Sequence, residues 1–429
     1  MRSYRSSTSI LLCSLRRPAF VLALFLALAM IAKHPVQAQS FTVLHYFTGG
    51  SDGANPVAGV TLGPAGTLYG TTYQGGTNAE GVVFKLVQRG SGWTLNPLHE
   101  FARRDGAFPL AGVAIGQDGA LYGTTYAGGS AQYGTVFKLT PPARGCQSII
   151  CYWNETVLHN FQGRPYDGAN PQFGNVVFDA AGNIYGTTLN GNGTGNEDCG
   201  TVWEVAVPGG MFSESVLYSF TGSSDGCHPA AGVIFDPAGN LYGNTQGTGS
   251  NNASVYELSP VNGSWMETTL GEQPQHIAPS YNPLIIDPSR NLYGTGYGYN
   301  GGEPGGVYKV DPQHGLSVVF LFQVGACRPY AGVTLGPDGN LYGVCQEGGT
   351  FGYGWVFEIP PNCDQTCTPN DLHDFSGSDG RYPDGNLVFD ASGNLYGTTY
   401  GGGQMGNACS EYGCGVVWEM AGVANPLRH

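Results

Sequence analysis

A hydrophobic residue followed by Tyr-Gly, usually with Thr-Thr after it, recurs seven times along the chain. Successive copies are 53, 63, 57, 51, 49 and 54 residues apart. This spacing is typical of one propeller blade per repeat, because one rung of a β-solenoid is usually much shorter. The repeat therefore predicts seven blades, marked by Tyr69, Tyr122, Tyr185, Tyr242, Tyr293, Tyr342 and Tyr396.

Each repeat contains four strand-like segments. In the first repeat these are residues 58–62, 67–73, 81–86 and 93–101, separated by turns rich in Gly, Pro and Asn. Alternating apolar residues, with many β-branched and aromatic side chains, indicate antiparallel strands. Residues 39–429 show no sustained helical pattern of apolar residues. We therefore expect an all-β fold built from four-stranded antiparallel blades.

The two ends of the chain supply complementary parts of one blade. The fourth-strand pattern, close to Val-Leu-His-x-Phe, has one copy ahead of the first repeat, at Val43–Phe47. The last repeat ends after Gly415–Met420 without a fourth strand. Pairing these two segments closes the ring and protects its sheet edges. We expect a seven-bladed β-propeller over residues 39–429, with an open β-solenoid as the alternative.

Residues 1–38 are typical of a signal peptide. A basic segment ending at Arg17 precedes the apolar run Phe20–Ala32, which is shorter than the ~20 residues that span a bilayer. Small residues around Ala38 mark a cleavage site. We expect export to the extracellular space or periplasm and no membrane span after cleavage. Residues 425–429 form no apolar tail, so we expect no surface anchor.

The charge balance excludes one class of partner. Removing residues 1–38 takes away five of the 17 basic residues and none of the 31 acidic ones, which leaves a net charge of −19. Such a surface repels phosphate backbones, so we do not expect a nucleic-acid partner. We expect a soluble monomer that meets an extracellular carbohydrate or protein surface.

Ten of the eleven cysteines lie after the predicted cleavage site, and an even number is typical of an exported protein with disulfides. Two close pairs occupy the same place in different repeats, and a third could close another short loop. With the four cysteines that remain, the pairs we expect are Cys146–Cys151, Cys363–Cys367, Cys409–Cys414, Cys199–Cys227 and Cys327–Cys345. A cysteine zinc site is the alternative.

Two kinds of loop are expected on one face of the ring: the loop that enters each blade, and the Gly-rich loop between the second and third strands. Five entry loops contain Asp-Gly-x-x-Pro. Carboxylates around a channel mouth would attract cations, but an Asp in such a loop can also bond its own loop amides. We favour the structural interpretation for these residues, which are Asp52, Asp105, Asp167, Asp225 and Asp379.

Two sets of residues on this face are the better binding candidates: those that depart from the repeat, and the tyrosines of the Gly-rich loops. Aromatic faces among amides and carboxylates suit sugar rings, although these side chains could instead pack loop against loop. The candidates are Tyr73, Tyr126, Tyr297, Tyr299, Tyr400, His228, His276, Arg328, Tyr330, Glu347, Arg381 and Tyr382.

Two repeated features are interpreted as structural. The Asp-x-x-Gly-Asn turn between the first and second strands, as at residues 179–183, uses Asp to cap backbone amides, with calcium binding as the alternative. The fourth-strand histidines are expected on the outermost strand of each blade, where packing is expected rather than a ligand pocket. They are His45, His99, His159 and His373.

The unit Gly-x-Leu-Tyr-Gly-Thr-Thr-x-x-Gly-Gly, followed by Gly-Thr-Val-Phe-Lys-Leu, resembles the GloVer tandem repeat of exported bacterial proteins. Residues 119–139 match it closely, and residues 66–86 and 393–418 nearly so. The resemblance implies export and a repeat architecture in a family with diverse C-terminal anchors; it implies no particular activity. The Asp-x-x-Gly-Asn-Leu-Tyr turn also resembles NHL and gluconolactonase-type propellers at the level of the fold.

Familiar catalytic motifs are absent from the sequence: it has no Gly-x-Ser-x-Gly elbow, no His-Glu-x-x-His and no phosphate-binding loop before a helix. We therefore expect a non-enzymatic binding module, with no catalytic residues and no cofactor. One alternative is a hydrolase or lyase, with or without calcium, in which Glu347 or Asp225 approaches another acid across the ring. The other is a structural cell-envelope scaffold.

Overall fold

The computed structural model describes residues 39–143, 151–165, 167–191, 198–207, 212–247, 253–272, 278–279, 281–298, 304–403, 409 and 411–424. Residues 39–429 belong to one compact unit. The predicted signal peptide, Cys146, His276 and Tyr299 lie outside the described residues. Within the described part, no helix is long and apolar enough to cross a bilayer.

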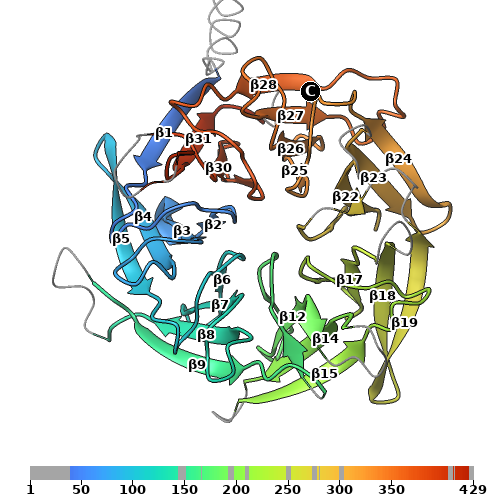
Figure 1. The fold of residues 1–429 in the computed structure, drawn as a ribbon. Coiled ribbons are helices and arrows are strands. Elements are labelled where there is room, and N and C mark those ends of the chain that lie inside the picture. Colours follow the sequence, from blue (N-terminus) through green and yellow to red (C-terminus); the bar gives the residue numbers. More distant parts are fainter. Residues whose placement is uncertain are drawn as a thin grey trace, which may run out of the picture. The chain divides into compact units, whose positions relative to one another are not determined.

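Seven antiparallel sheets surround a central axis, which confirms the predicted seven-bladed propeller (Figure 1). Blade 1 contains β2 (Thr61–Leu62), β3 (Leu68–Thr72), β4 (Val82–Arg89) and β5 (Gly92–Glu100), with a 3-10 turn at Pro64–Gly66. Blade 2 contains β6 (Ala114–Ile115), β7 (Leu121–Thr125), β8 (Thr135–Thr140) and β9 (Asn154–Asn160). Blade 3 contains β11 (Val177–Phe178), β12 (Ile184–Thr188), β14 (Thr201–Ala206) and β15 (Ser213–Ser219), beside a small ladder of β10 (Gly168–Ala169) and β13 (Asn190–Gly191).

The remaining blades follow the same order. Blade 4 contains β16 (Ile234–Phe235), β17 (Leu241–Asn244), β18 (Ser254–Val261) and β19 (Ser264–Glu272). Blade 5 contains β21 (Ile285–Ile286), β22 (Leu292–Tyr297), β23 (Gly306–Asp311) and β24 (Gly315–Leu321), and β20 (Ala278–Pro279) also pairs with β22. Blade 6 contains β25 (Thr334–Leu335), β26 (Leu341–Cys345), β27 (Trp355–Ile359) and β28 (Asn370–Asp374).

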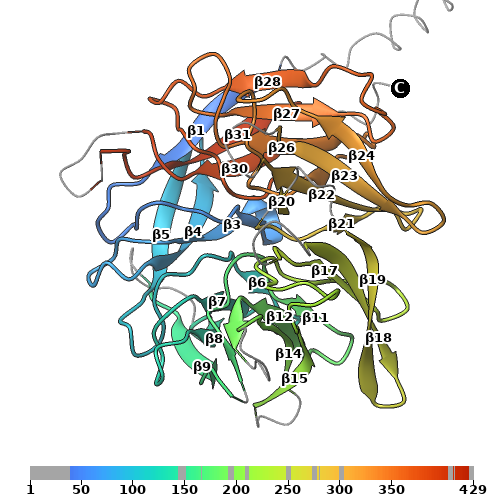
Figure 2. The same ribbon diagram turned by 45° about the vertical axis from the view of Figure 1, so that its right-hand side comes forward.

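Blade 7 joins the two ends of the chain. It contains β29 (Val388–Phe389), β30 (Leu395–Thr399), β31 (Val416–Ala421) and, as its outermost strand, β1 (Ser40–Tyr46). The pairing of β1 with β31 runs from Ser40 opposite Ala421 to Tyr46 opposite Val416, and both views of the ribbon show it (Figure 1 and Figure 2). The predicted closure through Val43–Phe47 is therefore confirmed.

The glycine of the repeated Tyr-Gly motif lies beneath a third-strand aromatic ring. Gly70 pairs with Phe84 across the ladder, and a Cβ atom added to Gly70 would lie 2.5 Å from that ring. Gly123 has the same relation to Phe137, at 2.7 Å. The glycine thus allows a fully buried aromatic ring to pack on the second strand, which is what links the second-strand and third-strand motifs.

Threonine hydroxyls of the second strands tie neighbouring blades together. Thr71 Oγ1 donates to the carbonyl of Ala111 in the chain that enters blade 2, at 2.8 Å. Thr398 Oγ1 donates at 2.9 Å to the carbonyl of Ala58, so the same bond links blade 7 to blade 1. These buried bonds explain why threonine follows Tyr-Gly in several repeats.

The first strands are shorter than the five residues predicted for blade 1. Only Thr61 and Leu62 form ladder pairs there, because the preceding residues pack around the axis. A Cβ atom at Gly59 would lie 1.8 Å from the carbonyl oxygen of Asn386, which belongs to the chain entering blade 7. Gly59 is therefore required for the close approach of two blades.

Candidate functional site

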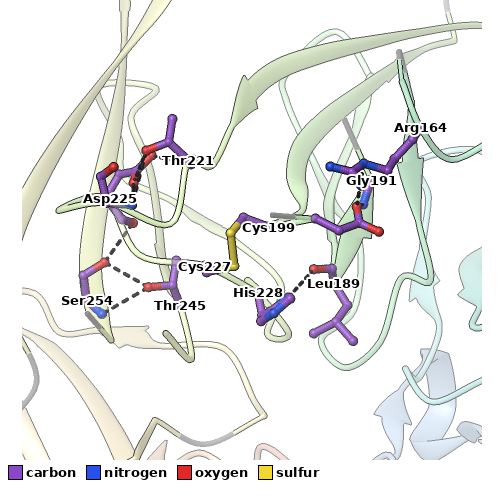
Figure 3. Close-up of a disulfide and its surroundings, with 12 residues drawn as sticks. Arg164, Leu189, Gly191, Cys199, Thr221, Asp225, Cys227, His228, Thr245 and Ser254 are labelled. Atoms are coloured by element: carbon purple, nitrogen blue, oxygen red, sulfur yellow. Dashed lines mark hydrogen bonds and ion pairs between the residues drawn. A yellow bond between two sulfur atoms is a disulfide. The ribbon is translucent and has the colours of Figure 1, made fainter. Parts of the chain in front are cut away.

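Four disulfides occupy pairs that we expected from the sequence: Cys199–Cys227, Cys327–Cys345, Cys363–Cys367 and Cys409–Cys414. They fit an oxidising extracellular or periplasmic environment. Figure 3 shows the Cys199–Cys227 bond, which joins the β13–β14 loop to the loop entering blade 4. His228 lies beside this disulfide, where its Nδ1 and the Leu189 carbonyl are 3.0 Å apart. His228 is thus part of a loop contact.

The aspartates of the Asp-Gly loops lie beside the fourth strands. Asp52 accepts a hydrogen bond from the Thr48 amide at 2.9 Å, as the structural interpretation of these loops requires. Its Oδ2 is also 3.1 Å from Nε2 of His45 on β1. Asp105, Asp167 and Asp379 pair in the same way with the fourth-strand histidines, and Asp225 pairs with the hydroxyl of Tyr218.

The aspartates of the entry loops and the histidines of the fourth strands therefore form one structural feature, although the sequence analysis interpreted them separately. Each pair fastens an entry loop to the fourth strand that precedes it. Burial alone would raise the pKa of Asp52, but hydrogen bonds from His45 and Thr48 lower it below the usual value. Asp52 is thus stabilised as a charged anchor of its loop. None of the five aspartates lines the hollow described next.

A hollow of about 410 Å³ opens where the entry loops of blades 1 and 7 meet the loops after β26 and β30. We call it the mouth hollow. Two of the sequence candidates in it, Glu347 and Tyr400, come from Gly-rich loops, and a third, Tyr382, comes from an entry loop. The complete lining is Val57, Gln346, Glu347, Tyr382, Asp384, Tyr400 and Tyr412.

Asp384 is the main titratable group of this hollow, and it was not among the sequence candidates. Gln346 Nε2 donates a hydrogen bond of 2.7 Å to its Oδ1. Burial, with a contribution from the Glu347 carboxylate, raises the pKa of Asp384 to about 7, although the Gln346 bond acts in the opposite direction. Near neutral pH the group can therefore either donate a proton or accept one.

An arginine–tyrosine cluster borders the hollow on the blade 7 side. The Arg381 guanidinium lies 4.9 Å from the ring centre of Tyr412 and 5.5 Å from that of Tyr382. It also donates to the backbone carbonyls of Tyr412 and Glu411, at 2.8 and 2.7 Å. Arg381 therefore positions two of the tyrosine rings that line the hollow.

A second aromatic group extends from the hollow towards blade 5. Tyr297 stacks on Tyr330, with ring centres 4.9 Å apart, and both rings stack with Tyr281. Arg328 lies over the Tyr330 ring and forms a 3.2 Å ion pair with Glu347. The structure thus brings Tyr297, Arg328 and Glu347 into one continuous surface with the mouth hollow.

Tyr73 continues the aromatic surface towards blade 2. Its ring lies 5.1 Å from that of Phe108. Burial raises the pKa of Tyr73, and the nearby Tyr126 hydroxyl adds to the effect. Tyr73 also contributes, after burial, to the raised pKa of Tyr400. The two sequence candidates Tyr73 and Tyr126 therefore lie near each other, at the edge of the tyrosine-lined region.

Two further cavities lie elsewhere on the ring. One of about 340 Å³ is lined by residues in and just before the first strands, among them Gly59, Asn175 and Asn386. Another of about 630 Å³ lies between blades 5 and 6, with Phe320 and Trp355 in its lining. The mouth hollow differs from both in combining tyrosine rings with two carboxyl groups.

Comparison with known proteins identifies the family. The family model of the Gloeobacter/Verrucomicrobia repeat matches residues 29–152 and 151–327. No curated protein matches the chain. An ulvan lyase of polysaccharide lyase family PL25 has a similar structure, with 11% identity over 89% of this chain and 97% of its own, and a TM-score of 0.54. A periplasmic gluconolactonase of Pseudomonas aeruginosa has 14% identity over 82% of this chain and 99% of its own, with a TM-score of 0.48. At these identities the likenesses concern the fold alone.

The family match covers more than half of the sequence, and the chain belongs to the Gloeobacter/Verrucomicrobia repeat family.

Proposed function

We propose that this protein is a secreted, monomeric binding module that holds an extracellular carbohydrate in the mouth hollow. The observation that carries the proposal is the meeting of three tyrosines with a half-buried acid and an amide: Tyr382, Tyr400 and Tyr412 line the same hollow as Asp384 and Gln346. Sugar rings present apolar C–H faces and a rim of hydroxyls, so they match aromatic surfaces bordered by hydrogen-bonding groups.

The hydrogen bonds of Asp384 leave capacity for a ligand. Among the described residues, the bond to its carboxyl comes from Gln346 and uses Oδ1. Below about pH 7 the acid is mainly protonated, and its hydroxyl can donate to a sugar oxygen while Oδ1 still accepts from Gln346. A neutral acid also places no fixed negative charge beneath a sugar ring.

The direct test is a polysaccharide array screened with residues 39–429 and with three variants. Tyr400→Ala and Asp384→Ala should give a much weaker signal than the wild type. Tyr133→Ala should keep it, because that tyrosine is 44% exposed and does not line the hollow. A signal that all four proteins share would contradict the proposed site. No signal from the wild type would contradict the carbohydrate ligand and favour a protein partner or an envelope scaffold.

A calcium chelator in a parallel screen separates the alternatives that involve metal. A signal that survives chelation supports binding by the tyrosines and Asp384 alone. A signal lost on chelation supports calcium as a cofactor. The aspartates of the Asp-Gly loops would then be the first residues to substitute.

A second candidate function is a polysaccharide hydrolase or lyase. The specific observation in its favour is that Glu347 shares the mouth hollow with Asp384, an acid whose pKa is about 7. An acid poised near the working pH, beside a second carboxylate, suits general acid–base catalysis. The test is product release from each polysaccharide that binds. Asp384→Asn should abolish turnover, and turnover that persists in both Asp384→Asn and Glu347→Gln would exclude this mechanism.

A further inference from the structure

The junction of blades 2 and 3 gathers three potential metal ligands away from the mouth hollow. His159 lies on β9, Asp167 follows in the loop that enters blade 3, and Glu214 lies on β15, the fourth strand of blade 3. The ligand atoms of the three side chains all lie within 4.8 Å of one another. We propose that His159, Asp167 and Glu214 bind a divalent transition-metal ion such as Zn²⁺ or Mn²⁺.

The separation of two of the ligand atoms, those of His159 and Asp167, suits a metal ion. Nε2 of His159 and Oδ2 of Asp167 are 3.1 Å apart. Two metal–ligand bonds of about 2.1 Å at a right angle place their ligand atoms about 3 Å apart. The ion would therefore replace the proton that the imidazole and the carboxylate now share. One imidazole with two carboxylates is a ligand set for zinc-like or manganese-like ions rather than for an all-oxygen calcium site.

Burial supplies a second, independent observation. Oε1 of Glu214 is buried, and the described residues offer it no hydrogen-bond partner. A buried carboxylate oxygen without a partner is unfavourable, and coordination to a cation removes that cost. Asp167 is already oriented, because it accepts hydrogen bonds from the amides of Gln162 and Gly168 at 2.7 and 2.6 Å. Such outer hydrogen bonds typically fix metal-binding carboxylates.

Two other junctions show that the glutamate is not needed to hold the loop. Where blades 7 and 1 meet, the position equivalent to Glu214 is Leu95, yet His45 still pairs with Asp52 at 3.1 Å. Where blades 3 and 4 meet, Tyr218 replaces the imidazole and pairs with Asp225 beside Glu267. The junction of blades 1 and 2 has the same residue types, His99, Asp105 and Glu155. Among the described residues, three such ligand atoms lie within 4.8 Å of one another at His159, Asp167 and Glu214.

The experiment is a calorimetric titration of chelator-treated residues 39–429 with Zn²⁺ and with Mn²⁺. The wild type should bind one equivalent of at least one ion. Glu214→Gln should bind it at least tenfold more weakly. Glu267→Gln is the matched control and should bind like the wild type, because Tyr218 supplies no imidazole at its junction. Near-ultraviolet circular dichroism of each variant shows that it is folded.

Two results would overturn the inference. One is the absence of saturable binding of either ion by the wild type. The other is equal affinity in the wild type and in folded Glu214→Gln. Neither result depends on carbohydrate binding at the mouth hollow, so the two proposals can fail separately.

Discussion

Replacing Asp384 with Asn should make the protein more stable at pH 8 and leave its stability at pH 4 nearly unchanged. Burial, with the Glu347 carboxylate beside it, raises the pKa of Asp384 to about 7. Between about pH 4 and pH 7 the unfolded chain releases the Asp384 proton while the folded chain keeps it. The free energy of unfolding therefore falls as pH rises through this window and levels off above pH 7. Asparagine has nearly the same shape and cannot ionise, so it removes this loss.

The size of the effect follows from the shift. A rise of about 3 units corresponds to a ceiling of about 4 kcal/mol, since one unit is about 1.4 kcal/mol. Asp384 as a residue keeps some contact with solvent, which screens its charge, and we expect about 2 kcal/mol at pH 8. Glu155 and Glu214, whose pKa values burial also raises to about 7, titrate in both proteins and cancel in the comparison.

The assay is urea unfolding of the wild type and Asp384→Asn at pH 4 and pH 8, with disulfides intact. Asp379→Asn is the matched control from the same loop. Burial opposes ionisation of Asp379, but hydrogen bonds from His373 and Ser376 outweigh it and lower the pKa, so this variant should lose stability at pH 8. The reasoning is refuted if Asp384→Asn is no more stable than the wild type at pH 8, or if the same gain appears at pH 4.

Three further predictions concern binding and the ring. Tyr400→Ala should weaken about tenfold the binding of an oligosaccharide that binds on the array, because one stacked ring contributes about 1 kcal/mol or more. Calorimetry measures the affinity, and an unchanged value would exclude Tyr400 from the site. Gly123→Ala should lower the free energy of unfolding by about 2 kcal/mol, because the added Cβ would lie 2.7 Å from the Phe137 ring. Gly92→Ala is the control and should leave that free energy nearly unchanged, because no atom lies within 4 Å of the Cβ it adds. Equal effects of the two changes in urea unfolding would contradict the packing argument. Thr398→Val should lower the free energy of unfolding by about 1–2 kcal/mol, because the buried carbonyl of Ala58 in blade 1 loses its hydrogen-bond donor. An unchanged free energy in urea unfolding would show that this bond does not stabilise ring closure.

The fold could be predicted from sequence because the glycine of the Tyr-Gly motif and the third-strand aromatic make a local contact that recurs in every blade. Gly70 is needed by Phe84 on the adjacent strand, so the two motifs keep a constant relation. The displaced fourth-strand pattern at residues 43–47 predicted the pairing with β31, since a ring must join its ends. The two-residue first strands were not predicted, because close packing around the axis involves all the blades at once.

The mouth hollow could be predicted only in part. Tyr382 and Glu347 stood out as departures from the repeat, and Tyr400 as a tyrosine of a Gly-rich loop; all three line the hollow. Asp384 was missed, although a signal existed: it follows the loop proline at a position where Val57 and Tyr330 occur in other blades. The signal is a carboxylate at a position that is otherwise uncharged.

The pairing of Asp52 with His45 could not be predicted, because the two residues belong to motifs that sequence reasoning treated separately. Only the ladder of blade 7 shows that the histidine on β1 points to the entry loop of blade 1. The inward grouping of tyrosines from blades 5, 6 and 7 likewise depends on the curvature of the ring, which repeat spacing does not specify.

The most direct test of the account is a crystal structure of residues 39–429 with an oligosaccharide retrieved from the array. The account predicts a sugar ring against Tyr382 or Tyr400, with one hydroxyl within hydrogen-bond distance of the Asp384 carboxyl. A sugar bound instead between blades 5 and 6, against Phe320 and Trp355, or on the outer edge of the ring, would contradict it.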